Sequence, residues 1–214
     1  MRVLWWAALA WFAGALIPGA YLLALVGMPA IPLGLVGIVT SVWYAAGRRP
    51  IAALGLADLV FFVMFGVVAV AGTYYVQAVS HQAVAPVPLS ALLVGLPVGA
   101  LVTNVLVIDD IRDVGFDTVK GWRTGAVRFG VAWSRREHVA LTVFAYLAPF
   151  GFALAWGPWL LLPVVTLPLA VMAERAVLTA GSRELLIPWT PRSAFLAMGY
   201  AFLLALGLAL ADQQ

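Results

Sequence analysis

Long apolar runs, separated by glycine, proline and charged residues, follow one another along the whole chain. A helix that crosses a bilayer needs about 20 mainly apolar residues, so each long run is a candidate crossing. Seven runs qualify, near residues 3–26, 32–46, 56–79, 88–108, 138–156, 158–178 and 191–211. No segment alternates apolar and polar residues over the roughly 10 positions of a membrane barrel strand. We therefore predict one all-α domain over residues 1–214, a polytopic helical membrane protein with about seven transmembrane helices.

Prolines inside these runs predict bent helices around a cavity rather than a straight bundle, because proline removes a helical hydrogen bond. They are Pro18, Pro97, Pro149, Pro163 and Pro168. Gly95 and Gly99 match the small-xxx-small pattern of closely packed membrane helices. The first run follows Arg2 closely, so a signal peptide is an alternative for it. A membrane helix is favoured, because the run stays apolar beyond the length of a signal peptide.

The composition agrees with membrane insertion, since 64% of the 214 residues are hydrophobic and 10% are charged. In an ordinary soluble domain about 45–50% of the residues are hydrophobic and about 25% are charged, so a water-soluble globule is excluded. The absence of cysteine excludes disulfides, thiolate catalysis and cysteine metal sites. The net charge of +3 could suggest a nucleic-acid partner, but the distribution of the basic residues points to membrane topology instead.

All 12 basic residues fall on one side of the membrane if the chain crosses it seven times. They are Arg2, Arg48, Arg49, those of residues 112–136, Arg175, Arg183 and Arg192. Lysine and arginine near membrane helices prefer the cytoplasmic side. We therefore expect an integral protein of a bacterial inner membrane, with its charged loops in the cytoplasm and its carboxy terminus outside.

Residues 109–137 hold 11 of the 21 formal charges. If the fourth helix continues past residue 108, Asp109, Asp113 and Asp117 recur every four residues, with Asp110 three residues before Asp113. We therefore expect these four carboxylates to share one helix face. Clustered carboxylates repel one another, and a divalent cation would reverse the sign of that interaction.

Magnesium bound to a diphosphate suits this segment. Mg²⁺ takes one or two carboxylates together with phosphate oxygens and water. Arg112, Lys120 and Arg123 could then bind the remaining phosphate oxygens. On residue types alone, a solvated cytoplasmic loop that fixes topology and contacts anionic lipid explains the segment equally well.

The order of the residues in this segment favours a magnesium diphosphate site over a solvated loop. Residues 110–117 (DIRDVGFD), followed by 121–124 (GWRT) and 126–130 (AVRFG), resemble the second aspartate-rich motif of the UbiA superfamily of intramembrane prenyltransferases. The similarity is strongest to the branch that prenylates 1,4-dihydroxy-2-naphthoate in menaquinone synthesis. Residues 43–50, 54–60, 65–66 and 72–77 carry the same resemblance.

This resemblance implies a helical bundle around a lipid-facing cavity, and a prenyltransferase acting on a polyprenyl diphosphate and an aromatic acceptor within the bilayer, with no nucleic acid involved. It implies Mg²⁺ bound by Asp109, Asp110, Asp113 and Asp117, of which the last three are the expected catalytic set. The expected substrate-binding residues are Arg112, Lys120, Arg123, Tyr44, Asp58 and Asn104.

The chain also departs from the family pattern. Asp109 and Asp110 stand where the branch usually has an amide pair, and Trp122 stands where it has a lysine. The family's first aspartate-rich motif, between its first two helices, has no counterpart here, because residues 1–108 contain Asp58 as their one acidic residue. We therefore expect about 80–100 further amino-terminal residues, forming two helices and a second carboxylate cluster. They would be encoded upstream or in a separate gene.

Three single residues have two interpretations each. Asp58 either complements the dipole at a helix start or faces the aromatic acceptor. Asn104 is better explained as an amide that bridges two helices than as a ligand. Tyr44 belongs to an interfacial aromatic belt or lines the cavity, where its ring would stabilise an allylic cation.

Two other functions are compatible with the sequence. A catalytically impaired protein that binds isoprenoids or quinones would explain the missing first motif. A small transporter would explain broken helices next to charges. We rank the transporter last, because the dense charge lies in one loop and no symmetrical pair of broken helices is present.

Overall fold

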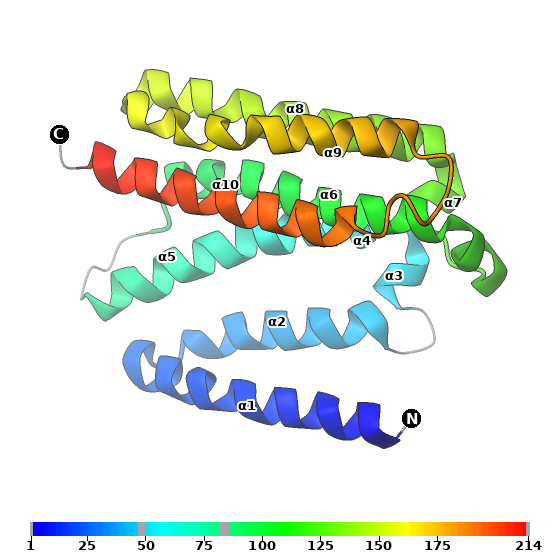
Figure 1. Ribbon diagram of the computed structural model, residues 1–214. Coiled ribbons are helices and arrows are strands. Elements are labelled where there is room, and N and C mark those ends of the chain that lie inside the picture. The colour runs from blue at the N-terminus through cyan, green and yellow to red at the C-terminus, as the bar shows by residue number, and fades with distance from the viewer. Residues whose placement is uncertain (1, 47–49, 82–85, 213–214) are drawn as a thin grey trace.

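The structure is a computed structural model that describes residues 2–46, 50–81 and 86–212, and these residues form helices with no strand among them (Figure 1). The elements are α1 (Arg2–Val26), α2 (Ala30–Ala45), α3 (Ile51–Leu54), α4 (Ala57–Val63), η1 (Met64–Val68), α5 (Ala69–Ser80), α6 (Leu89–Lys120), α7 (Gly125–Phe129), α8 (Val131–Trp156), η2 (Pro158–Thr166), α9 (Leu167–Thr179) and α10 (Trp189–Ala211). Each predicted apolar run is helical, which confirms the all-α fold.

Six helical stretches of the described residues are long and apolar enough to cross a membrane. They are Val3–Val26, Ala57–Ser80, Leu89–Lys120, Val131–Trp156, Pro158–Thr179 and Trp189–Ala211. The second predicted run forms a shorter apolar helix, Ala30–Tyr44. These lengths and compositions fit a polytopic membrane protein.

Two irregular turns interrupt the helices, and proline explains one of them. The sixth run begins as the 3-10 helix η2, which contains Pro163. The π-helical turn η1 contains no proline. Conversely, α1, α6 and α8 run without a break in their helical assignment through Pro18, Pro97 and Pro149. The predicted breaks therefore do not occur at these three prolines, since a proline can be accommodated by the helices around it. Pro168 lies in the first turn of α9, where proline is tolerated. Bending of these helices stays a prediction.

Helix α6 is the central element and contacts α4, η1, α8 and α10. Gly95 and Gly99 of α6 lie against Gly66 of η1, so closely that a Cβ atom on Gly99 would be 2.6 Å from the Gly66 Cα. This confirms the close packing predicted from the small-xxx-small pattern. On the opposite side, Leu101 packs in a core with Ala145 and Tyr200 of α8 and α10. Half of the most apolar window of α6 is therefore buried within the protein.

Helices α1 and α2 lie side by side at the edge of the bundle, away from α6 and α10 (Figure 1). Helix α1 contacts only α2 and α5 extensively among the described elements. Its tryptophans are largely exposed, at 69% for Trp5, 71% for Trp6 and 81% for Trp11. Exposed tryptophan on an apolar helix is suited to contact with lipid.

The loops fall into two groups at the two ends of the bundle (Figure 1). The charged end holds α3, α7, the last turns of α6 and the connection between α9 and α10. The other end holds the connections α1–α2, α5–α6 and α8–η2 and the end of α10. Arg48 and Arg49 lie outside the described residues. Charged side chains between α6 and α8 thus meet those between α9 and α10 at one end.

Candidate functional site

The carboxy-terminal part of α6 carries the candidate site. About 20 residues suffice to cross a bilayer, so residues 89–108 would span it and the remainder of this 32-residue helix would extend beyond. The extension carries Asp109, Asp110, Asp113 and Asp117 and ends at Gly121. Gly121 adopts a left-handed φ of 71°, and its amide group donates a hydrogen bond to the Thr118 carbonyl.

The four aspartates lie within about 100° of arc on this extension, and their surroundings divide that arc into two adjacent narrow faces. Asp109 and Asp113 are partly exposed, whereas Asp110 and Asp117 are buried, at 7% and 5% exposure. Asp110 and Asp117 are seven residues apart and are aligned by almost two helical turns, and Asp109 and Asp113 lie beside them toward the α9–α10 connection. The described residues contain no group of three or more His, Asp or Glu side chains placed to hold one metal ion. The register of the continuous helix α6 thus agrees with the prediction that the four carboxylates share one side of it, although their surroundings differ, and the predicted metal ligands stay a prediction.

One face forms an arginine–aspartate cluster of Asp109, Arg112, Asp113, Arg183 and Thr190. The Arg112 guanidinium lies 2.6 Å from Asp109 Oδ1 and 2.6 Å from Asp113 Oδ2. Arg183, from the α9–α10 connection, lies 3.0 Å from Asp113 Oδ1. The Thr190 hydroxyl donates to Asp109 Oδ1 at 2.6 Å. Both carboxylates of this face are thus neutralised by side chains of the same chain.

The other face forms a buried carboxylate cluster of Asp58, Asp110, Asp117 and Glu137. Asp58, Asp117 and Glu137 lie close enough to Asp110 for their charges to disfavour its ionised form. None of the four forms an ion pair with a lysine or arginine of the described residues. Asp58 Oδ1 and Glu137 Oε2 are buried without a hydrogen-bond partner. The carboxylates of this face therefore lack the arginine partners that neutralise those of the first face.

The short helix α7 supplies the hydrogen bonds that this buried cluster does have. The Gly125 amide donates to Asp110 Oδ2 at 3.3 Å, and the Thr124 hydroxyl donates to Asp117 Oδ2 at 3.4 Å. Gly125 also lies against Asp58, because a Cβ atom there would be 3.2 Å from Asp58 Oδ2. Three carboxylates, those of Asp58, Asp110 and Asp117, therefore converge on the start of α7.

Of the other predicted site residues, Asp58 and Tyr44 lie near the buried cluster. Asp58 is in the first turn of α4, but its side chain reaches α7, so it does more than complement a helix dipole. The charges of Asp110 and Asp58 act on the Tyr44 hydroxyl, and the Tyr44 ring lies 5.3 Å from that of Phe61. Both residues border the cluster from elements other than α6.

The other three predicted site residues, Asn104, Lys120 and Arg123, make contacts outside the buried carboxylate cluster. Asn104 Nδ2 donates to the His138 carbonyl at 3.2 Å and to Thr142 Oγ1 at 2.8 Å, which confirms the favoured role of an amide that bridges α6 and α8. The Lys120 ammonium lies over the rings of Phe116 and Trp122. The Arg123 side chain is exposed, and its backbone amide donates to the Ala53 carbonyl. Neither cation forms an ion pair with a carboxylate of the described residues.

Sequence reasoning assigned no site role to four residues that complete the two clusters. Glu137 and Thr124 lie inside the segments already singled out, so a helix-by-helix register could have indicated them. Arg183 and Thr190 are about 70 to 80 positions from their aspartate partners. No local pattern in the sequence predicts that contact.

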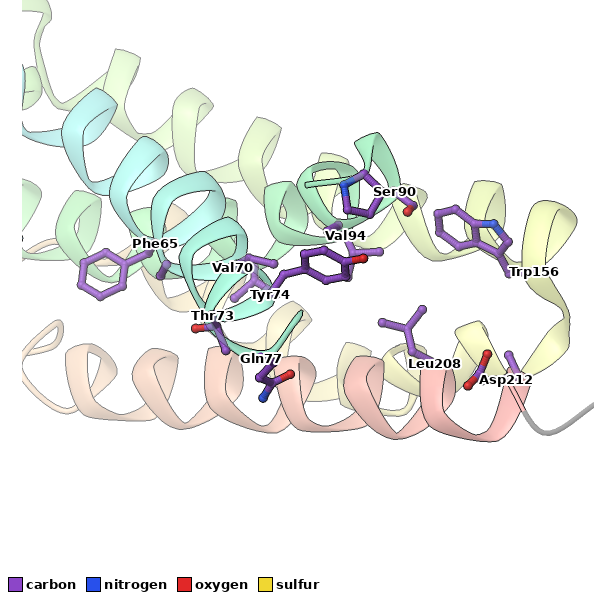
Figure 2. A pocket seen from close by; sticks show the side chains of 15 residues that line it. Phe65, Val70, Thr73, Tyr74, Gln77, Ser90, Val94, Trp156, Leu208 and Asp212 are labelled. Atoms are coloured by element: carbon purple, nitrogen blue, oxygen red, sulfur yellow. The ribbon is translucent and has the colours of Figure 1, made fainter. Parts of the chain in front are cut away.

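A cavity of about 890 Å³ lies at the end of the bundle opposite the charged end (Figure 2). Side chains of η1, α5, α6, α8 and α10 line it, including Phe65, Tyr74, Gln77, Val94, Trp156 and Leu208. Its wall is mainly apolar, with a few polar groups at its outer end. Such a cavity suits an apolar chain or ring.

Comparison with known proteins places these features in context. The pattern of the UbiA prenyltransferase family matches residues 2–199. The chain is 32% identical to a 1,4-dihydroxy-2-naphthoate octaprenyltransferase of Escherichia coli over 84% of this chain and 57% of the relative. It is 36% identical to one from Mycobacterium tuberculosis over 77% of this chain and 54% of the relative.

A more distant relative is a UbiA prenyltransferase domain-containing protein of Dictyostelium discoideum, 27% identical over 64% of this chain and 40% of the relative. The chain thus spans about half the length of the curated relatives it matches. No solved structure gives a significant match.

Proposed function

The chain belongs to the UbiA prenyltransferase family, and we propose that it transfers a polyprenyl group from a polyprenyl diphosphate to an aromatic quinone precursor such as 1,4-dihydroxy-2-naphthoate. The observation that carries this proposal is the helical extension of α6. It presents aspartates on two faces, beside arginines, at one end of an apolar helical domain. A cationic and metal-binding surface for a diphosphate next to an apolar interior for its prenyl chain suits such a transfer.

Mg²⁺ is the ion that we propose for this site. The donor set fits it, because buried carboxylate oxygens without a positive partner converge near Asp110. Asp110 and Asp117 would be its direct ligands, and Asp109 and Asp113, the other predicted ligands, would act on it from the other face through their charge. The separation of the carboxylates agrees with an ion that takes only one or two of them and fills its remaining positions with phosphate and water. Bound Mg²⁺ supplies charge neutralisation and Lewis acidity to the diphosphate.

The residues of the chain have separate roles in this proposal. Arg112, already positioned by Asp109 and Asp113, would bind oxygens of the leaving diphosphate. Lys120 and Arg123, at the end of the same extension, would approach it from the solvent side. Asp58 and Tyr44 would border the aromatic acceptor. An apolar surrounding excludes water, so that the allylic cation reacts with the ring carbon of the acceptor and not with water.

The prenyl chain would follow α6 into the apolar interior. Val98 of the outer cavity is about 18 Å along the axis of α6 from Asp110, at 1.5 Å per residue. A polyprenyl chain whose diphosphate lies at the charged end could therefore extend toward the cavity of Figure 2. The proposed direction places the charged group outside the apolar layer and the hydrocarbon within it.

We also propose an orientation in the membrane. The excess of lysine and arginine at the charged end favours a cytoplasmic position for that end. In a bacterial inner membrane the end of α10 would then face outward. A second carboxylate cluster, supplied by amino-terminal residues or by a separately encoded two-helix polypeptide, would bind the metal diphosphate from the opposite side. The reason is that phosphate charge left unpaired beside an apolar cavity is costly.

A protein that binds isoprenoids or quinones without catalysis is the second candidate. It is favoured by the neutralisation of Asp109 and Asp113 by arginines and by the single acidic residue in residues 1–108.

One assay separates the two candidates. Membranes containing the 214-residue chain are incubated with octaprenyl diphosphate, 1,4-dihydroxy-2-naphthoate and Mg²⁺, and the lipid extract is analysed by mass spectrometry. A prenylated naphthoate product, lost when the metal is chelated, supports the transferase. Tight binding of the diphosphate without product supports the second candidate. A parallel sample with a co-expressed two-helix segment tests whether that segment raises the rate.

A further inference from the structure

A second pocket at the charged end is separate from the buried carboxylate cluster. It has a volume of about 460 Å³ and lies between the extension of α6, the start of α8 and the α9–α10 connection. Its polar lining includes Arg112, Arg135, Ser182 and Arg183, and its apolar lining includes Ile111, Val131 and Leu186. The pocket is therefore amphipathic, with a basic part and an apolar part.

The charge of this lining is positive. Three arginines face one carboxylate, that of Asp113, among the lining residues. Arg135 donates through Nη2 to the Ala180 carbonyl at 2.6 Å, but its Nε is buried and has no hydrogen-bond partner. The Arg183 side chain is 62% exposed and so remains accessible to a ligand. An anion with several oxygens would satisfy the unpaired Arg135 donor and balance the excess charge.

The surroundings of the pocket place it at the boundary between apolar and polar surface. Ile111 and Arg112 of α6, Val131 and Arg135 of α8, and Leu186 and Arg183 of the α9–α10 connection all line it, so each of the three elements contributes both an apolar and a basic side chain to the pocket. Large apolar side chains near it are exposed: Phe116 by 55%, Leu185 by 58% and Ile187 by 52%. Exposed apolar and aromatic residues at the ends of membrane helices mark the level of the lipid headgroups.

We propose that this pocket binds the phosphate group of an anionic phospholipid, with Arg135 and Arg183 as its main ligands and the apolar wall beside the glycerol and the first acyl carbons. Basic pockets between membrane helices at the cytoplasmic surface commonly take anionic headgroups. The amphipathic lining favours a lipid over a free phosphate ion, which has no apolar part to bury. Arg183 also belongs to the arginine–aspartate cluster, whereas Arg135 and Ser182 belong to neither cluster, so the Arg135 variants test this site independently of the proposed prenyl transfer.

The test compares lipids on the purified 214-residue chain in neutral detergent at about 150 mM salt, where exposed charges are screened. Native mass spectrometry records how much phosphatidylglycerol and how much phosphatidylcholine of the same acyl chains remain bound. We expect retention of phosphatidylglycerol to exceed that of phosphatidylcholine. Arg135→Gln and Arg183→Gln should each reduce this preference about fivefold.

Matched controls are Arg136→Gln and Arg175→Gln, which change exposed arginines of α8 and α9 outside the pocket. Both should leave the preference unchanged. Arg135→Lys retains the charge and should retain most of the preference. A preference lost in Arg135→Gln but kept in Arg135→Lys is then due to the lost charge and not to unfolding. Arg183→Gln changes an exposed side chain and tests the site even if Arg135 variants unfold.

Three results would overturn the proposal. One is equal retention of the two lipids by the unchanged chain. Another is an equal loss of preference in the pocket variants and the controls, which would show a general effect of surface charge. The third is displacement of the lipid by inorganic phosphate or diphosphate at similar concentrations, which would make this a site for a soluble anion.

Discussion

The two faces of the α6 extension contain the same residue type but differ in how its charge is balanced. On one face, Asp109 and Asp113 are neutralised by Arg112 and Arg183. On the other, Asp110 and Asp117 are buried beside further carboxylates and receive only hydrogen bonds from Thr124 and Gly125. The first arrangement is complete without a ligand, whereas the second lacks positive charge.

This difference indicates how the site would respond to a metal diphosphate. The buried cluster offers the uncompensated carboxylates that attract a cation, and the arginine–aspartate cluster offers positioned arginines for an anion. A metal diphosphate carries both charges. The comparison therefore predicts that equivalent substitutions on the two faces have opposite effects on stability, although both reduce activity.

The largest expected effect is on catalysis and involves one aspartate from each face. Asp113→Ala together with Asp117→Ala should lower the rate of prenyl transfer more than about 100-fold, since loss of even supporting partners of a metal ligand costs 10- to 100-fold. The measurement is the initial rate of product formation in membranes, normalised to protein amount. Glu184→Gln is the matched control, because Glu184 is an exposed carboxylate of the α9–α10 connection. Activity that survives the double substitution would remove these aspartates from the metal site.

The arginine–aspartate cluster should stabilise the fold. Asp113→Asn leaves Arg112 and Arg183 without the carboxylate that they share, so we expect a loss of about 1–3 kcal/mol. Thermal unfolding of the purified chain in detergent, without diphosphate or metal, measures this as a lower melting temperature. An unchanged melting temperature would mean that solvent already screens this ion pair.

The buried carboxylate cluster should respond in the opposite direction. Asp110→Asn keeps an acceptor for the Gly125 amide and removes a carboxyl that is costly to bury, because burial, and then the charges of Asp58 and Asp117, raise the pKa of Asp110 to about 8. At pH 7 the aspartate must take up a proton on folding and the asparagine need not, so we expect a gain in the free energy of unfolding of up to about 1 kcal/mol. The same unfolding measurement applies, and Asp109→Asn on the other face serves as the control. A destabilised Asp110→Asn variant in the metal-free sample would show that this cluster does not carry uncompensated negative charge.

The helices themselves were predictable, because apolar run length directly reflects the thickness of the bilayer. The packing of Gly95 and Gly99 was also predictable from their spacing. The π-helical turn at Met64–Val68 was not, and it coincides with the close approach of Gly66 to Gly95 and Gly99, which are distant in the sequence. The unbroken helices at Pro97 and Pro149 likewise depend on buried neighbours.

For the candidate site, the aspartate-rich segment was predictable from the sequence, but the partners of its aspartates were not. The helical period places all four aspartates within about 100° of arc, so it does not reveal that Asp109 and Asp113 meet arginines whereas Asp110 and Asp117 are buried beside other carboxylates. The contact of Arg183 with Asp113 depends on the path of the α9–α10 connection, which no periodicity describes. Long-range contacts of loops are the part of a site that one sequence reveals least.

The smallest expected effects come from two glycines beside the two clusters. A methyl group at Gly125 would lie 3.2 Å from Asp58 Oδ2 and 3.3 Å from the Trp133 ring, closer than most such contacts. Gly125→Ala should therefore destabilise the chain by about 1 kcal/mol by forcing Asp58 or Trp133 to move. Gly115 is exposed within α6, and a methyl group added there would have no neighbouring atom within 4 Å, so Gly115→Ala should instead stabilise the chain by about 0.5–1 kcal/mol. Melting temperatures of both variants in detergent provide the comparison, because the chemical change is identical and only the surroundings differ. If both glycines tolerate alanine equally, α7 does not hold Asp58 in the tight contact on which the buried cluster depends.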